Sequence, residues 1–200
     1  MRSGFTVWLT GCPGAGKTTV ARSLADQLRS TGRGVEVLDG DDVRRAISPD
    51  LGFSRSDRDL NVQRLGYIAG LLSRNGVAAI VAAVSPYRAA RDRVRHSHEA
   101  PFIEVFVDCS IEELIRRDQK GLYSGALRGD VAAMTGVSDP YERPLAPEVH
   151  LHTDREPAVD CSARVVRALV DRHLIGVPAD HDVTAAAKVS RIHAMMPRRP

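Results

Sequence analysis

Apolar runs alternate with amphipathic stretches along most of the chain. Five short, continuously apolar runs are typical of buried strands, and they cover residues 5–10, 34–40, 76–84, 101–109 and 148–153. The stretches between them predict helices over 17–30, 88–98, 111–118 and 158–174, with short helices after the second run and a long polar segment before the last. Strands that alternate with helices predict an α/β fold, with a doubly wound, five-stranded parallel sheet covered on both faces.

The pattern occupies one domain and then stops. A chain of 200 residues suits a single packed core, which we place at 1–175. The stretch "GVPADHD" breaks the alternation, and "VTAAAKVSRIHAMM" is compatible with one more helix. We therefore expect 176–200 to be an appended C-terminal tail.

Composition excludes several classes of protein. Hydrophobic residues make up 43% and charged residues 26%, and no apolar run approaches the roughly 20 residues of a membrane-spanning helix. Cys12, Cys109 and Cys161 are odd in number and widely separated, which favours reduced thiols and a cytoplasmic protein without membrane partners. A net charge of +3 gives no argument for nucleic acid, and we expect the arginine-rich stretch "YRAARDRVRHSH" to be an exposed helix face.

The strongest chemical signal is "GCPGAGKTT", which has the complete Walker A spacing between a strand and a helix. Its glycines let backbone N–H groups surround phosphates, Lys17 reaches the phosphates, and Thr18 offers a hydroxyl to Mg²⁺. A P-loop nucleotide-binding fold is therefore expected. For Cys12, we favour an inert side chain over a thiol activated by the local field. The residues expected to contact ATP are Gly11, Cys12, Pro13, Gly14, Ala15, Gly16, Lys17, Thr18 and Thr19.

Acidic residues directly after the second strand point to a small-molecule kinase. Asp39, Asp41 and Asp42 lie in "LDGDDVRR", where ligands bind at the carboxyl edge of an open α/β sheet. A carboxylate there can orient an acceptor hydroxyl or a magnesium-bound water. The alternative is an acidic turn that caps a helix over 43–47. The chain also lacks the guanine-recognition, mechanical-ATPase and transporter signatures of other P-loop proteins.

Several motifs together resemble the adenylylsulfate (APS) kinase family, which is nucleoside-monophosphate-kinase-like in fold. They are "TVWLTG" before the P-loop, "LDGDDVR", "LGFSRSDRDLN", "VSPYR", "RDQKGLY", "TGVSDPYE" and "PEVH", in the family's order over roughly residues 5–175. The resemblance implies transfer of the ATP γ-phosphate to the 3′-hydroxyl of adenosine 5′-phosphosulfate (APS), which makes PAPS. It also implies Mg²⁺ and, as in many relatives, a homodimer.

The resemblance implies roles for the matching residues. Asp41 becomes the base or metal-orienting carboxylate, and with Thr18 it would hold Mg²⁺. Arg117 and Lys120 would begin a lid over ATP, the alternative being a solvated charged face. Some descriptions of the family treat the serine of "VSPYR" as a phosphorylated intermediate, which in-line transfer does not need. The implied catalytic residues are Asp41, Lys17, Ser85 and Asp39. The implied acceptor-binding residues are Arg44, Phe53, Arg58, Asn61, Ser85, Lys120 and Met134.

The chain departs from the family pattern on the acceptor side. Ser124, Gly125 and Leu127 stand where two lysines and an arginine are expected, and Arg128 is shifted by one position. Met134 replaces a stacking phenylalanine. Three further changes lie outside the lid: Asp42 replaces an asparagine, and Leu60 and Gln63 replace an acid and an arginine. Three hypotheses follow: a divergent APS kinase, a related kinase with another anionic acceptor, and a nucleotide-binding module without turnover.

Two histidines raise the question of a metal site. His150 and His152 share one face of the fifth strand. No third ligand has suitable spacing, so we expect packing or solvent exposure rather than zinc.

Overall fold

The computed structural model describes residues 3–118, 121–130 and 134–176. Lys120 and nearly all of the expected tail lie outside these ranges. Among the described residues, no helix is long and apolar enough to cross a membrane.

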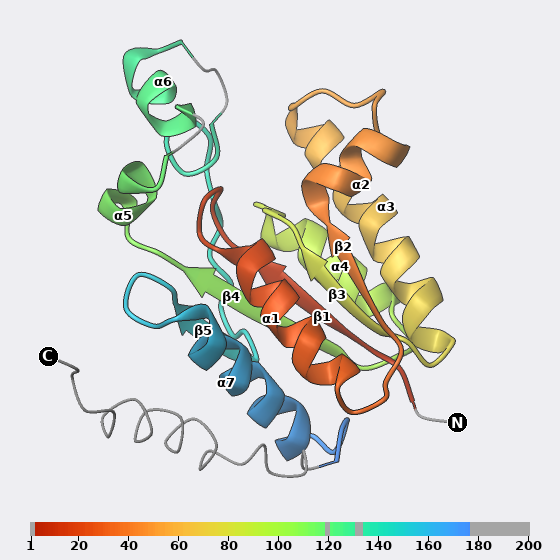
Figure 1. Cartoon of the computed structure of the whole chain (residues 1–200). Coiled ribbons are helices and arrows are strands. Elements are labelled where there is room, and N and C mark those ends of the chain that lie inside the picture. Colours follow the sequence, from red (N-terminus) through yellow and green to blue (C-terminus); the bar gives the residue numbers. More distant parts are fainter. Residues whose placement is uncertain (1–2, 119–120, 131–133, 177–200) are drawn as a thin grey trace, which may run out of the picture.

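The five strands form one parallel sheet in the order β2-β3-β1-β4-β5, which confirms the predicted fold class (Figure 1). Their bounds are β1 (Phe5–Thr10), β2 (Val35–Asp39), β3 (Ala78–Ala82), β4 (Phe102–Asp108) and β5 (Val149–His152). The three central strands are almost wholly buried. In the edge strand β5 buried residues alternate with more exposed ones, and in β2 only Leu38 is buried, so the expectation of continuous burial is wrong there. An edge strand has a neighbour on one side only, and solvent reaches its other side.

The helices match the predicted ones except in two segments. One is the segment after β2, and the other is the long polar segment before β5. Their bounds are α1 (Lys17–Arg29), α2 (Gly40–Ile47), α3 (Arg55–Arg74), α4 (Arg88–Ser97), α5 (Ile111–Arg116), α6 (Leu122–Arg128) and α7 (Ala158–Asp171). The sequence predicts only short helices after β2, but α3 has 20 residues. Helix α6 lies in the segment that the sequence predicts as irregular. The Asp118 carboxylate accepts the N–H groups of Leu122 and Ser124 at 2.8 and 3.0 Å, which satisfies the first turn of α6.

Alternation along the central strands divides the core between two layers. Val7 and Leu9 face one cluster, which includes apolar residues of α1 and α7, and Trp8 faces the other, which includes residues of α3 and α4. Helices α3 and α4 approach each other closely at Gly66, where an added Cβ would lie 2.7 Å from methyl groups of Val94. The sheet is therefore covered on both faces, as predicted.

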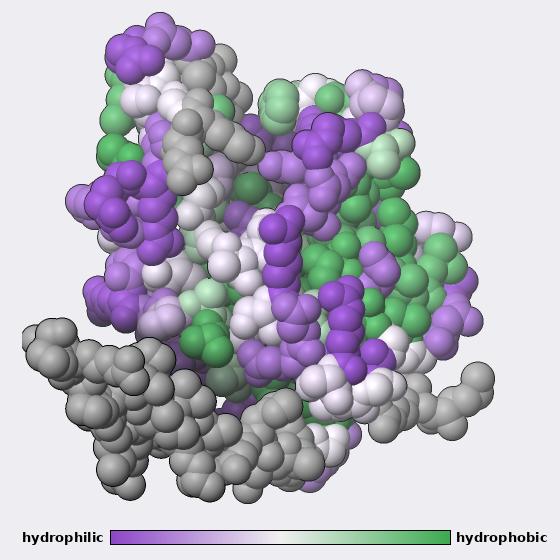
Figure 2. Space-filling model, viewed as in Figure 1, coloured by the Kyte–Doolittle hydropathy of each residue, from purple (hydrophilic) through white to green (hydrophobic). Residues whose placement is uncertain are grey.

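The carboxyl ends of the strands carry the segments that build the site. Figure 1 shows α5 and α6 on one side, and α2 with the start of α3 on the other, extending beyond this edge of the sheet. Figure 2 shows the surface hollowed between these two parts. The P-loop, which connects β1 to α1, lies at this edge.

Candidate active site

The P-loop is held by close backbone packing. An added Cβ at Gly11 would lie 2.3 Å from the carbonyl oxygen of Val107 in β4, so only glycine fits. Gly16 takes a left-handed conformation, with φ 87°, immediately before α1. The hydroxyl of Thr153, just after β5, donates to the Ala15 carbonyl at 2.8 Å, and the Tyr123 hydroxyl of α6 donates to the Pro13 carbonyl at 2.7 Å. The loop is thus fixed from neighbouring strands and from α6.

Lys17 is enclosed by this loop. Its ammonium donates to the Gly11 and Cys12 carbonyls at 2.9 and 2.8 Å, and the residue is only 8% exposed. Burial lowers the pKa of Lys17 to about 8, although Cys12, Asp41 and Asp39 oppose this shift. A buried cation whose ammonium donates to neutral carbonyls favours an anionic ligand such as a phosphate. Burial raises the pKa of the Cys12 thiol, which supports the expected inert side chain.

Asp39 connects the P-loop to α2. Its carboxylate accepts a 2.6 Å hydrogen bond from the Thr18 hydroxyl and a 3.0 Å bond from the Asp41 amide. Asp39 is therefore both the N-cap of α2 and a partner of the Walker A threonine, so the capping interpretation is confirmed for Asp39 and its functional role stays a prediction. Asp41 is an exposed residue in the first turn of α2, within electrostatic range of Lys17. Asp42 is exposed and pairs with Arg45, away from Thr18.

Three of the residues expected to bind the acceptor lie together beside α2 and the start of α3. Phe53 is 66% exposed, which excludes the alternative of a core aromatic. The guanidinium of Arg44 lies 4.4 Å from the Phe53 ring centroid, and that of Arg58 lies 5.7 Å away. Arg44 also donates to the Leu51 and Gly52 carbonyls, and Arg58 to the Phe53 carbonyl at 2.9 Å. An exposed aromatic ring beside two guanidinium groups suits a flat, anionic ligand.

A turn at 134–139 joins this cluster to the P-loop. Arg58 donates to the Thr135 hydroxyl at 2.7 Å, and a Cβ at Gly136 would lie 3.0 Å from the Cys12 sulfur. Met134 is buried in the hydrophobic core, so in this structure it offers no exposed surface for stacking. The side chain of Asn61 is buried one turn after Arg58, and its Oδ1 has no hydrogen-bond partner among the described residues.

Ser85 lies beneath the site rather than in its open part. The residue is 3% exposed, and its hydroxyl accepts from the Trp8 indole and donates to the Thr10 hydroxyl, both at 3.0 Å. Its backbone has a φ of 39°, which is unusual for serine. Arg91 fixes this strained segment after β3 by donating to the Ser85 carbonyl at 2.7 Å, while its own charge is paired with Glu104 at 2.7 Å.

Arg91 corrects the expectation of an exposed arginine-rich helix face. It is 2% exposed, and Arg95 on the same helix is half-buried and bonded to Glu148 at 2.7 Å. The sequence could not show this, because the partner carboxylates come from β4 and from the segment before β5. Sequence reasoning also missed Thr153 and Tyr123, whose side-chain bonds to the P-loop require the fold.

Of the two residues expected to begin the lid, the structure describes one, Arg117. Arg117 donates to Glu113 at 2.6 Å and to the Thr153 carbonyl at 2.8 Å, which places it beside the P-loop. It follows α5 and is half-buried, rather than part of a solvated face. Lys120 lies outside the described residues. Ser124 binds Asp118, Leu127 is exposed, and Arg128 pairs with Asp130.

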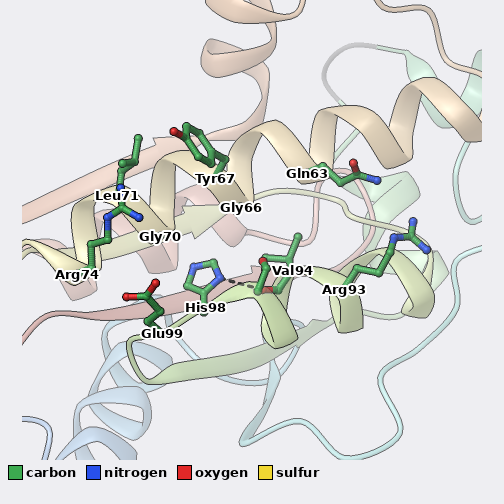
Figure 3. A pocket seen from close by; sticks show the side chains of 11 residues that line it. Gln63, Gly66, Tyr67, Gly70, Leu71, Arg74, Arg93, Val94, His98 and Glu99 are labelled. Carbon is green, nitrogen blue, oxygen red and sulfur yellow. Dashed lines mark hydrogen bonds between the residues drawn. The ribbon is translucent and has the colours of Figure 1, made fainter.

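Two of the departures lie on the exposed side of α3, and their assignment to the acceptor side stays a prediction. Leu60 and Gln63 are exposed on α3, whereas Arg58 and Asn61 turn inward. Gln63 lines a surface pocket of about 450 Å³ between α3 and α4, together with Tyr67 and His98 (Figure 3). No P-loop residue lines this pocket, so its size gives no evidence about phosphate transfer.

The expectation that no third ligand accompanies His150 and His152 is wrong. Asp108 at the end of β4 lies beside them, with its carboxylate 3.1 Å from the His150 Nε2 atom. The contact depends on the pairing of β4 with β5, which residue spacing in the sequence does not reveal.

Comparison with known proteins gives consistent matches over most of the chain. The family model described as adenylylsulphate kinase matches residues 3–152. An adenylyl-sulfate kinase of Chloroflexus aurantiacus is 52% identical over 168 residues, which cover 84% of this chain and 90% of the relative. One from Picosynechococcus sp. is 46% identical and covers 84% of this chain and 94% of the relative. The structure of the Mycobacterium tuberculosis APS kinase in complex with AMPPNP and APS has a TM-score of 0.80 at 38% identity, covering 84% of this chain and 99% of that chain.

Proposed function

The chain belongs to the adenylylsulphate kinase family, and from that premise we propose that it transfers the γ-phosphate of ATP to the 3′-hydroxyl of APS, making PAPS and ADP. The observation that carries this proposal is the identity of about half of all aligned residues with enzymes named adenylyl-sulfate kinase over 84% of the chain. The geometry is compatible with it, because a phosphate-binding loop and an exposed aromatic in contact with two arginines flank one edge of the sheet.

On the donor side, the P-loop binds the ATP phosphates. Lys17 exchanges the Gly11 and Cys12 carbonyls for phosphate oxygens, which compensate its buried charge more strongly. The backbone N–H groups at the start of α1 add to this binding. Binding here depends on a loop conformation that the sheet and α6 already impose.

Thr18 and Asp39 would hold Mg²⁺. Their hydroxyl and carboxylate oxygens lie 2.6 Å apart at the start of α1, and such hard oxygen donors suit this ion. When bound, Mg²⁺ supplies positive charge that compensates the phosphate oxygens. This assignment gives Asp39 the metal-orienting role that the sequence assigns to Asp41.

On the acceptor side, Phe53 stacks on the adenine, and Arg44 and Arg58 bind the phosphosulfate. Asn61 offers to the same ligand its buried Oδ1, which has no partner in the part of the chain that the structure describes. Asp41 accepts the proton of the 3′-hydroxyl as that oxygen attacks in line. Ser85 supports this region through Trp8 and Thr10 and forms no covalent intermediate.

The part of the molecule formed by α5 and α6 closes the site. Arg117 lies next to the P-loop through Thr153, and Lys120 follows it in the same segment. Closure excludes water, which would otherwise accept the phosphate. Met134, at the start of the turn that contacts Arg58, borders the acceptor without stacking on it.

Two further properties complete the proposal. We place the enzyme in the cytoplasm, in keeping with three free cysteines, and we expect a homodimer, as the family resemblance implies. Size-exclusion chromatography with light scattering measures the second property directly.

The test is ADP release from Mg-ATP by the purified full chain, with APS, with AMP, with other nucleotides and without acceptor. The proposal predicts saturable turnover with APS that is absent from the Lys17→Ala variant. Turnover with another acceptor but not with APS would support a changed acceptor instead. If no ADP is released with any of the acceptors, a nucleotide-binding module without turnover would be the better account.

A further inference from the structure

A cluster of three possible metal ligands lies at the carboxyl ends of β4 and β5, outside the site that we propose for phosphate transfer. The strand register pairs Asp108 with His152, and His150 is two residues earlier on the same face of β5. One ligand atom from each of these three residues lies within 4.8 Å of the others. The two imidazole rings are 4.3 Å apart between centroids.

We propose that Asp108, His150 and His152 bind a divalent transition metal ion, with Zn²⁺ the best fit. Two imidazoles and one carboxylate are a common ligand set for zinc, and the fourth position stays open to water. Donor atoms about 2.0–2.1 Å from a tetrahedral zinc ion lie roughly 3.3 Å from one another. The His150 Nε2 and Asp108 Oδ2 atoms are already 3.1 Å apart, and the ligand atom of His152 lies within 4.8 Å of the other two, so a side-chain rotation of His152 completes the set.

The surroundings support this geometry. The His150 ring stacks on Phe106, with centroids 4.8 Å apart and planes 27° apart, which restricts its orientation. The side chain of His150 is 43% exposed, so an ion can reach it from solvent. The guanidinium of Arg143 lies 3.8 Å from Asp108 and is itself exposed, so it can move away when a metal ion takes its place.

The cluster is separate from Thr18 and Asp39 but close to the P-loop. Asp108 follows Val107, whose carbonyl oxygen packs against Gly11. None of the three ligands is assigned to phosphate transfer, so the inference does not depend on the proposed function.

The test uses Co²⁺ as a spectroscopic probe of the zinc site in the full chain, after treatment with a chelator. The expected result is one bound equivalent of Co²⁺, with visible absorption typical of nitrogen and oxygen ligands and no thiolate charge-transfer band. His150→Ala and His152→Asn should each lose this equivalent, and added Zn²⁺ should displace Co²⁺ from the wild-type protein.

The matched control is His96→Ala, because His96 is an exposed histidine on α4 outside the cluster. This variant should bind Co²⁺ as the wild type does. Thermal unfolding in chelator shows whether each variant folds, and either cluster variant alone decides the test if the other does not fold. Absence of binding in the wild type, or binding that survives both cluster substitutions, would overturn the proposal. The second result would show an adventitious ion at another histidine or cysteine.

Discussion

The two sides of the candidate active site are held in different ways. On the donor side, Lys17 is buried and bonded to loop carbonyls, and the loop itself packs on β4. On the acceptor side, Phe53 is exposed, and Arg44 and Arg58 donate to carbonyls of the loop between α2 and α3. The donor side is therefore organised by close backbone packing, whereas the acceptor side depends on exposed or half-buried side chains. Substitutions should have larger effects on the donor side.

The largest effect is expected from Lys17→Ala. Loss of this buried cation removes a charge that compensates the transferred phosphate, and kcat/KM with APS should fall by roughly 10²- to 10³-fold. Thermal unfolding checks the fold, which should survive because burial of this charge opposes folding. Near-normal turnover in a folded variant would contradict the donor assignment.

Asp39→Asn should have the next largest effect. The substitution keeps an oxygen for the Asp41 amide but removes the charge beside Thr18, so we expect kcat to fall by roughly 10²-fold and more Mg²⁺ to be needed. The matched control is Asp42→Asn, since Asp42 is exposed and pairs with Arg45. Titration of the rate with Mg²⁺ measures both variants, and equal behaviour would reject the metal role of Asp39.

ATP affinity should depend on pH through Lys17. Its pKa of about 8 is below the ordinary value for lysine, so the charge that binds phosphate is lost as pH rises through about 8. A rise from about pH 7 to about pH 9 should weaken ATP binding to the free enzyme by roughly tenfold. Calorimetry at several pH values measures this, with Lys17→Ala as the variant whose weaker binding should stay flat. A flat wild-type profile would mean that Lys17 keeps its proton.

Phe53→Ala should have the smallest of these effects. Loss of one stacking face costs about 1 kcal/mol, so the KM for APS should rise roughly fivefold while kcat and thermal stability change little. Tyr67→Ala is the matched control, because Tyr67 is 69% exposed on α3 and lines the pocket that contains no P-loop residue. If both variants raise the KM equally, Phe53 has no specific part in acceptor binding.

The difference between a site held by its local backbone and one held by side chains from distant segments also explains what could be predicted from the sequence. The strands, the P-loop and α1 follow from local pattern and spacing, because the backbone requires glycine at Gly11 and Gly16. The exposure of Phe53 was also predictable from the polar stretch around it. The partners of Asp39 and Arg91 were not, because Thr18 and Glu104 come from other strands and helices and meet them only in the folded sheet.

The departures from the family pattern also show that the sequence does not reveal which way a side chain points in the folded chain. On the sequence alone, Leu60 and Gln63 count as losses from the acceptor side, but the helical turn of α3 directs them to its outer face. Met134 keeps its place at a turn that contacts Arg58, but its side chain is in the core. The lid changes at Ser124, Gly125 and Leu127 remain the strongest sequence argument for a different acceptor, although Ser124 has a structural role at the start of α6.

The most direct test of the central claim is to identify the product that the purified enzyme makes from Mg-ATP and APS. We predict one new phosphate per ADP released, bonded to the 3′-oxygen of APS, as phosphorus NMR and mass spectrometry can show. The Lys17→Ala variant should form almost none. Release of free phosphate instead, or phosphorylation of APS at another position, would contradict the assignment of the two sides of the site.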